Sequence, residues 1–124
     1  MRLLLDTHIF IWWIEDIPFE RAALDAVADP ANEVLVSAAS IWEAEIKVAT
    51  GKLRLATDLI EELGTNGFLD VAVSARHGVA AARLPRHHAD PFDRMLVAQA
   101  QLEGLTLVTR DPVFDDYAVA VLRA

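Results

Sequence analysis

The sequence of 124 residues contains no cysteine. Disulfide bonds, thiolate metal sites and a cysteine nucleophile are therefore excluded, and a bound metal ion must use oxygen or imidazole ligands. Long hydrophobic runs are missing too, because no stretch approaches the roughly 18 uncharged apolar residues that a membrane span needs. The first residues, MRLLLD, reach charged side chains too early for a signal peptide. We therefore expect a soluble, cytoplasmic protein without membrane contact.

Basic residues are few: 11 lysines and arginines stand against 19 aspartates and glutamates, so the formal net charge is −8. This sign is wrong for a protein that binds nucleic acid by broad neutralisation of phosphates. The objection weakens if several carboxylates converge on a divalent cation, because the ion reverses the local field and itself binds phosphate oxygens. The positions of the acidic residues therefore matter more than their number.

Glycine and proline are sparse, with five of each, and they occur singly between periodic segments. The chain contains no linker, low-complexity run or internal repeat. Its length and its hydrophobic content of 54% suit one compact domain over residues 1–124.

Alternating strand and helix patterns run through the chain. Short apolar runs that end on polar residues predict buried strands at 2–5, 34–36 and 105–108, with weaker candidates at 68–71 and 119–122. Helical periodicity predicts helices at 9–14, 19–28, 40–50, 57–63, 74–83 and 91–103, of which the fourth should stop at Gly64. This order indicates an α/β fold with a mainly parallel central sheet and helices on both faces. The ligand site of such a sheet lies at the carboxyl ends of its strands.

Two aspartates follow predicted strands. Asp6 comes directly after the first, and Asp111 lies just beyond the third, while Ser37 and Thr109 occupy equivalent strand ends. Each aspartate also has a structural interpretation, because Asp6 or Thr7 could cap the next helix and an aspartate before proline commonly opens a turn. Neither acid identifies a site by itself.

Two more aspartates lie at the start of the last predicted helix. Asp90 fits its N-cap, and Asp93 fits the third position of a capping box. Asp93 is the more informative, because Leu96 and Val97 follow it at helical spacing and place its stem on a largely apolar face. A carboxylate in such surroundings needs a partner.

Two glutamates on the helix predicted at 40–50 compete for one role. At about 100° per residue, Glu45 lies near the middle of the apolar face, so periodicity favours it as the anomalous acid. That face consists of Ile41, Trp42, Val48 and Ala49. Glu43 lies beside Lys47 on the far side, where a solvated ion pair worth a few tenths of a kcal/mol is the simple interpretation. A helix buried on both sides could still point Glu43 into a cleft.

Four segments in this order resemble the PIN-domain family, from Leu3 to about Tyr117. They read LLLDTH at 3–8, VSAASIWE at 36–43, DPFDRMLVAQA at 90–100 and LTLVTRD at 105–111. The resemblance to the VapC-type toxins in particular rests on three short motifs: Trp-Glu, Asp-Pro-Phe-Asp-Arg and Ala-Gln-Ala. The resemblance of the second segment extends to Lys47 and to the Gly-Lys-Leu at 51–53.

The resemblance implies a metal-dependent endoribonuclease, the toxin of a toxin–antitoxin pair, that hydrolyses RNA in an acidic pocket. Carboxylate ligands suit Mg²⁺, with Mn²⁺ as a substitute. The implied metal-binding and catalytic acids are Asp6, Glu43, Asp93 and Asp111, with Asp90, Ser37 and Thr109 in support. Glu43 is thereby favoured over Glu45, and Asp90 stays open between ligand and helix cap. The implied partners are an RNA substrate and a cognate antitoxin, in a homodimer or a toxin–antitoxin hetero-oligomer.

A competing interpretation is a catalytically inactive PIN-like module that binds proteins and whose acids are caps and ion pairs. Metal binding separates the two, because only the enzyme requires it. Trp42 is expected in the core, whereas Trp12 and Trp13 fit either the core or a partner-binding groove. The four histidines show no ligand spacing and are expected to be non-catalytic: His8, His77, His87 and His88.

Overall fold

The computed structural model describes all 124 residues and contains one sheet of five strands. Every neighbouring pair is parallel, in the order β3-β2-β1-β4-β5, which confirms the predicted α/β class. The strands are β1 (Arg2–Leu5), β2 (Glu33–Ser37), β3 (Leu69–Val71), β4 (Thr106–Thr109) and β5 (Val121–Arg123). Because β1 lies at the centre, its carboxyl end is flanked by the ends of β2 and β4.

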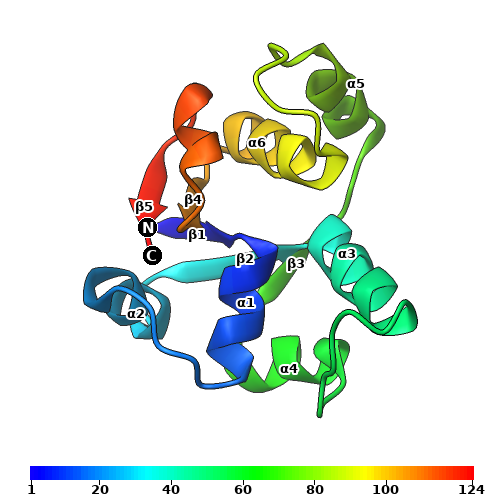
Figure 1. Ribbon diagram of the computed structural model, residues 1–124. Helices are drawn as coiled ribbons and strands as arrows, with labels where there is room; N and C mark the ends of the chain where they lie inside the picture. The colour runs from blue at the N-terminus through cyan, green and yellow to red at the C-terminus, as the bar shows by residue number, and fades with distance from the viewer.

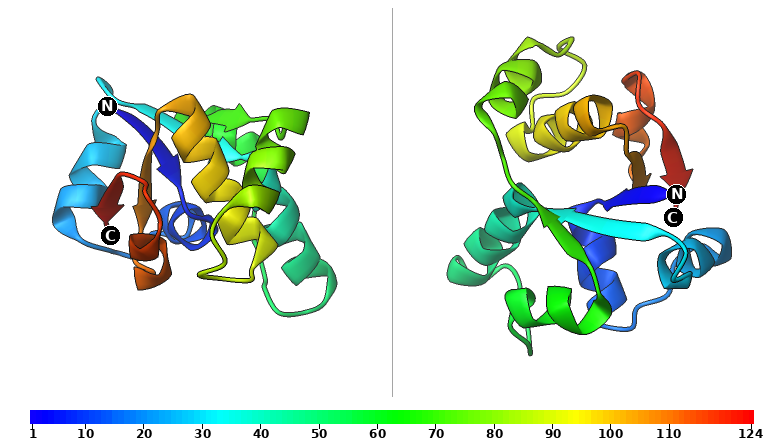
Figure 2. Two further views of the ribbon diagram at one scale, coloured as in Figure 1. Left: turned by 90° about the horizontal axis from the view of Figure 1, so that it is seen from above. Right: turned by 180° about the vertical axis from the view of Figure 1, so that it is seen from behind.

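Helices cover both faces of the sheet (Figure 1). They are α1 (Thr7–Ile14), α2 (Arg21–Ala28), α3 (Ala38–Ala49), α4 (Leu59–Asn66), α5 (Ala75–Arg83) and α6 (Pro91–Glu103), with a 3-10 helix at Pro112–Asp116. α5 and α6 lie on one face and the first four helices on the other, as the view from behind also shows (Figure 2). No helix combines the length and the apolar character that crossing a membrane requires.

The side chains of β1 divide between two hydrophobic cores. Leu3 and Leu5 join the core beneath α1 to α4, while Leu4 joins the core beneath α6. All three are fully buried. Successive side chains of a strand point to opposite faces, so a strand covered on both sides is apolar throughout rather than alternating. The continuous run of leucines before Asp6 is thus explained.

The end of α4 differs from its prediction. The helix passes through Gly64 and ends at Gly67, which has a left-handed φ of 68°. The Phe68 amide donates to the carbonyl of Leu63, which closes the helix end. Gly64 makes no such turn and remains an ordinary helical residue. The sequence alone could not show which of the two glycines ends the helix, because only the turn at Gly67 requires a positive φ.

Trp42 is not in the core, contrary to expectation. Its exposed fraction is 64%, and its ring contacts the edge of Phe92 with centroids 5.5 Å apart. α3 instead turns Ala39, Ser40 and Ala44 inward. These small residues allow the helix to approach its neighbours closely. Ile41 is partly buried against the larger core, whereas Trp42, Ile46 and Val48 are exposed.

Trp12 and Trp13 are both partly buried and pack against the larger core. The indole N–H of Trp13 donates to Asn66 at 3.0 Å, and the guanidinium of Arg110 lies 4.8 Å from the Trp12 ring centroid. Both rings also line an open hollow on the surface. Their packing against the core agrees with the first of the two roles that the sequence left open, while a role in partner binding stays a prediction.

Candidate functional site

The carboxyl ends of β1 and β4 bring Asp6 and Thr109 together. The amide of Asp6 donates to the Val108 carbonyl at 2.9 Å, and the Thr109 hydroxyl donates to Asp6 Oδ2 at 2.7 Å. The same hydroxyl accepts from the amide of Asp111 at 3.1 Å. Thr109 thus connects both strand-end aspartates. Asp6 occupies the N-cap position of α1, but its side chain makes no capping hydrogen bond.

Asp6 is a carboxylic acid in a largely dehydrated position, with only 5% of its surface exposed. Burial raises its pKa, and the negative charge of Glu43 raises it further, while the Thr109 hydrogen bond and His8 act in the opposite direction. No lysine or arginine forms an ion pair with it. A buried carboxylate in this state favours either a proton or a cation.

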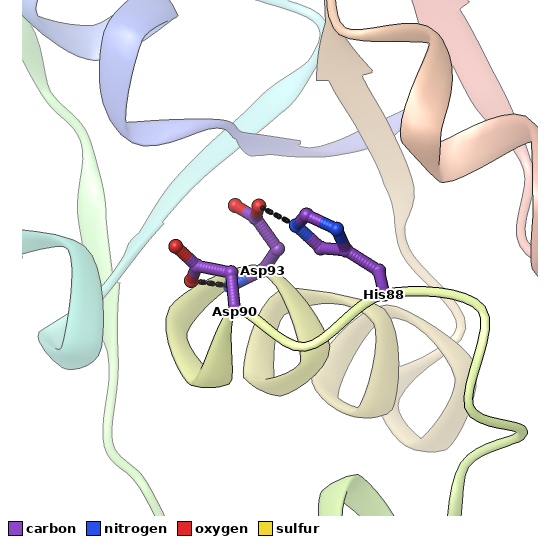
Figure 3. Close-up of side chains that lie close together, drawn as sticks. All are labelled: His88, Asp90 and Asp93. Carbon is purple, nitrogen blue, oxygen red and sulfur yellow. Dashed lines mark hydrogen bonds and ion pairs between the residues drawn. The ribbon is translucent and has the colours of Figure 1, made fainter.

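Asp90 and Asp93 divide two roles at the start of α6. Asp90 Oδ1 accepts from the amides of Phe92 and Asp93 at 2.8 and 3.0 Å, so Asp90 is the N-cap. The carboxylate of Asp93 does not complete a capping box. Its Oδ2 lies 2.8 Å from His88 Nε2 (Figure 3). Burial raises the pKa of Asp93 to about 6, assisted by the charges of Asp90 and Asp6 and opposed by His88.

The structure separates the two glutamates of α3. The side chain of Glu43 is 13% exposed and lies close enough to Asp6 to raise its pKa. Its carboxylate also pairs with Lys47 at 3.3 Å. Glu45 is exposed on the outside of the helix. Periodicity therefore misplaced Glu45, because most of the apolar face on which it was placed (Trp42, Val48 and Ala49) is exposed.

Asp111 and Ser37 have capping roles at other strand ends. Asp111 Oδ1 accepts from the Val113 amide at 3.0 Å and starts the 3-10 helix, as its position before proline suggested. Its exposed side chain shares a surface hollow with Asp6. Ser37 is fully buried, and its hydroxyl accepts from the Ala39 amide at 3.0 Å. Ser37 therefore sets where α3 begins, upstream of Glu43.

His88 joins the acidic residues although the spacing of the histidines does not single it out. One ligand atom from each of His88, Asp90 and Asp93 lies within 4.8 Å of the other two. His88 belongs to the loop before α6, which Arg94 holds in place. The Arg94 guanidinium donates to backbone carbonyls of that loop and of the end of α5: Ala81, Leu84, Pro85 and His88. These contacts are not local, so no helical period could predict them.

Comparison with known proteins identifies the family. The model of the PIN domain matches residues 3–120. The chain belongs to the PIN-domain family. This PIN domain is 31% identical over 117 residues to Ribonuclease VapC22 of Mycobacterium tuberculosis (strain ATCC 25618 / H37Rv), covering 88% of this chain and 86% of that protein.

Solved structures support the fold of this PIN domain. It is similar to VapBC2 from Rickettsia felis bound to a DNA fragment from the promoter, with a TM-score of 0.70 and 18% identity over 99% of this chain and 98% of the other. It is also similar to a toxin–antitoxin complex from Klebsiella pneumoniae, with a TM-score of 0.67 and 21% identity over 97% and 95%. Identities this low show a shared fold and nothing finer.

The donor set of the PIN domain fits a small divalent cation. Asp6 and Asp93 carry pKa values raised by burial, act on one another electrostatically and have no lysine or arginine partner. Anionic oxygens in such surroundings are the ligands that Mg²⁺ and Mn²⁺ prefer. A cation would offset the unfavourable burial of these charges. The pocket can therefore hold a hard metal ion at the carboxyl end of the sheet.

Proposed function

We propose that this protein is a metal-dependent endoribonuclease and the toxin component of a toxin–antitoxin pair. The observation that carries the proposal is the pair of half-buried and buried carboxylates, Asp93 and Asp6, which no lysine or arginine neutralises. The similarity to Ribonuclease VapC22 over most of both chains supports the RNA substrate. The proposed unit is one PIN-like domain over residues 1–124, acting in the cytoplasm.

In this proposal Asp6 and Asp93 hold the principal ion, while Glu43 and Asp111 complete the pocket and orient water. When bound, Mg²⁺ or Mn²⁺ supplies an activated water and offsets the charge that develops on the phosphodiester. Thr109 holds the Asp6 carboxylate by its 2.7 Å hydrogen bond. Two further residues act through backbone geometry, because Ser37 and Asp90 cap the helices that carry Glu43 and Asp93.

A cognate antitoxin is the proposed protein partner, in a toxin–antitoxin hetero-oligomer or together with a toxin homodimer. The Klebsiella pneumoniae neighbour is a toxin–antitoxin complex, which supports a partner of this class. An arginine or lysine from the antitoxin would suit the negative pocket, since charged hydrogen bonds to carboxylates are strong. If the antitoxin still inhibits after every basic residue is removed from its tail, this electrostatic account is wrong and steric covering of the pocket explains the inhibition.

The test is cleavage of a panel of structured RNAs with Mg²⁺ or Mn²⁺ and with EDTA. Cleavage should occur with either metal and stop in EDTA; equal cutting in EDTA would refute the proposal. Glu43→Gln and Glu45→Gln form a matched pair on one helix. We expect the first to lower the rate about 100-fold or more, as loss of a metal-site group does, and the second to leave it unchanged.

An inactive, protein-binding PIN module is the second candidate. The capping bonds of Asp90 and Asp111 and the Glu43–Lys47 ion pair favour it, because they give three of the acids structural roles. This candidate predicts no metal binding by calorimetry and no cleavage of any RNA in the panel. Binding of a cognate antitoxin would persist unchanged in Asp93→Asn.

A further inference from the structure

We infer that His88 is an additional metal ligand, so that the site offers an imidazole nitrogen beside its carboxylates and prefers Mn²⁺ to Mg²⁺. The inference rests on the proposed function, since it concerns the same pocket. The geometry that carries it is a cluster of three potential ligands. His88 Nε2 lies 2.8 Å from Asp93 Oδ2, and Asp90 supplies a carboxylate oxygen within 4.8 Å of both (Figure 3).

The 2.8 Å separation of His88 Nε2 and Asp93 Oδ2 is close to that of neighbouring ligands around an octahedral ion, and the Asp90 oxygen lies within 4.8 Å of both atoms. With metal–ligand bonds of about 2.1 Å, adjacent ligand atoms lie roughly 3.0 Å apart and opposite ones roughly 4.2 Å. The contact of His88 with Asp93 fits two adjacent positions after a small opening. Asp90 uses only Oδ1 for its two capping bonds. Its Oδ2 makes no hydrogen bond and can face a cation without loss of the cap.

An independent observation on another element also points to a cation here. Asp6, at the end of β1, is nine-tenths buried, has no lysine or arginine partner and acts electrostatically on Asp93. The negative charge near Asp93 therefore comes from both the sheet and α6. The imidazole of His88 forms a direct hydrogen bond with the Asp93 carboxylate. A neutral imidazole adds a ligand without adding further negative charge.

The position of His88 is fixed in advance of metal binding. The Arg94 guanidinium donates to the His88 carbonyl at 3.2 Å and to the Pro85 carbonyl at 2.9 Å. It also bonds the Ala81 carbonyl on α5 at 2.9 Å. The loop is therefore pinned to two helices, while the Nδ1 atom of His88 makes no hydrogen bond. The ring can turn within a fixed backbone, as exchange of a hydrogen bond for a metal bond requires.

The ligand chemistry gives a measurable selectivity. Imidazole binds transition-metal ions well, whereas Mg²⁺ prefers oxygen ligands and retained waters. Removal of His88 should therefore weaken Mn²⁺ binding more than Mg²⁺ binding. For His88→Gln we expect about a 10-fold loss of Mn²⁺ affinity and a clearly smaller loss for Mg²⁺.

The experiment uses the full chain, MnCl₂ and MgCl₂, without RNA. Pulsed electron paramagnetic resonance of bound Mn²⁺ detects a coordinated imidazole nitrogen, and calorimetry gives both affinities. His87→Gln is the matched control, because His87 is the adjacent residue and its ring packs against Tyr117 instead of the acids. We expect the nitrogen signal in the wild type and in His87→Gln and its loss in His88→Gln.

Each remaining outcome decides against the inference. Mn²⁺ that binds the wild type without a nitrogen signal excludes His88 as a ligand and leaves the ribonuclease proposal intact. This measurement needs no variant, so a folding defect cannot obscure it. A nitrogen signal that persists in His88→Gln assigns the ligand to another histidine, such as His8. Absence of Mn²⁺ binding, or binding unaffected by Asp93→Asn, overturns the proposed function as well.

Discussion

Two histidine–carboxylate pairs in this molecule have the same length and opposite surroundings. His77 Nε2 lies 2.8 Å from Glu103 Oε1, and His88 Nε2 lies 2.8 Å from Asp93 Oδ2. His77 also accepts from the Ser74 amide through Nδ1 and completes the capping box of α5. Because Nδ1 accepts, a neutral His77 carries its proton on Nε2, and this N–H donates a hydrogen bond to Glu103.

The second pair lies among charges that remain unbalanced. Burial raises the pKa of Asp93, and the charges of Asp90 and Asp6 raise it further, whereas the side chain of Glu103 is 46% exposed and reaches water. No backbone amide determines the tautomer of His88. Both contacts are 2.8 Å long, so the distance alone does not separate the structural pair from the pair proposed to bind metal. The charges around the carboxylate and the other hydrogen bonds of the imidazole differ between the two pairs.

Replacing the acidic residue of each pair should have the largest effect on RNA cleavage. Asp93→Asn should lower RNA cleavage about 100-fold or more, while Glu103→Gln should leave it unchanged, because only Asp93 faces the proposed ion. Asp6→Asn should behave like Asp93→Asn. Without metal, the stability of both variants should be unchanged or raised, since a mutual repulsion is removed. Cleavage rates with Mg²⁺ and urea melts measure this, and destabilised but fully active variants would contradict the assignment.

Replacing the histidine of each pair should separate an effect on stability from an effect on metal binding. His77→Ala removes a buried capping partner and should lower the free energy of unfolding by about 1 to 3 kcal/mol. Its Mn²⁺ affinity should match that of the wild type. His88→Ala should lose Mn²⁺ affinity while its free energy of unfolding changes by less than about 0.5 kcal/mol, as at partly exposed positions. Urea denaturation and calorimetry on both variants provide the check; equal stability losses would erase the distinction.

The pH dependence of stability tests the electrostatic difference. The pKa of Asp93 is raised from 3.8 to about 6 in the folded protein, so the fold holds this proton more tightly than the unfolded chain does. That stabilisation is complete below a pH of about 4 and is lost as the pH rises through about 6. We expect the metal-free protein to lose on the order of 1 to 3 kcal/mol across this window.

Asp93→Asn should reduce this slope, because its amide does not titrate there, while Asp6, whose pKa burial also raises, keeps part of it. Glu103→Gln is the control and should keep the slope of the wild type. Urea melts at closely spaced pH values measure the effect. A stability that rises with pH between about 4 and 6 would mean that Asp93 is ionised more easily in the fold than in the unfolded chain.

The smallest expected effect concerns Asp90, which borders the second pair. Asp90→Ala should cost about 0.5 to 2 kcal/mol by loss of the N-cap, whereas Asp90→Asn should cost little, because asparagine caps equally well. If Asp90 is also a ligand, Asp90→Asn should weaken Mn²⁺ binding at unchanged stability. Unchanged affinity in Asp90→Asn would limit Asp90 to capping. Thermal melts and calorimetry of the two variants give the answer.

Features that depend only on neighbouring residues were predictable from the sequence. Apolar runs that end on polar residues predicted the central strands and the positions of Asp6 and Thr109 at their ends. The N-cap at Asp90 was likewise predictable, because capping involves only the next three residues. The four family segments in order predicted the PIN fold; they also implied Glu43 rather than Glu45 as a site residue, which stays a prediction.

The rotation of these elements, and the groups that each side chain contacts, depend on tertiary packing. A helical period gives the angles between residues of one helix, but not the side that faces the sheet, so it misplaced Trp42 and Glu45. The small inward residues of α3 decided that rotation. The approach of His88 to Asp93 depends on a loop that Arg94 pins through distant carbonyls. Such contacts join residues whose separation in sequence follows no period, so only the packed fold reveals them.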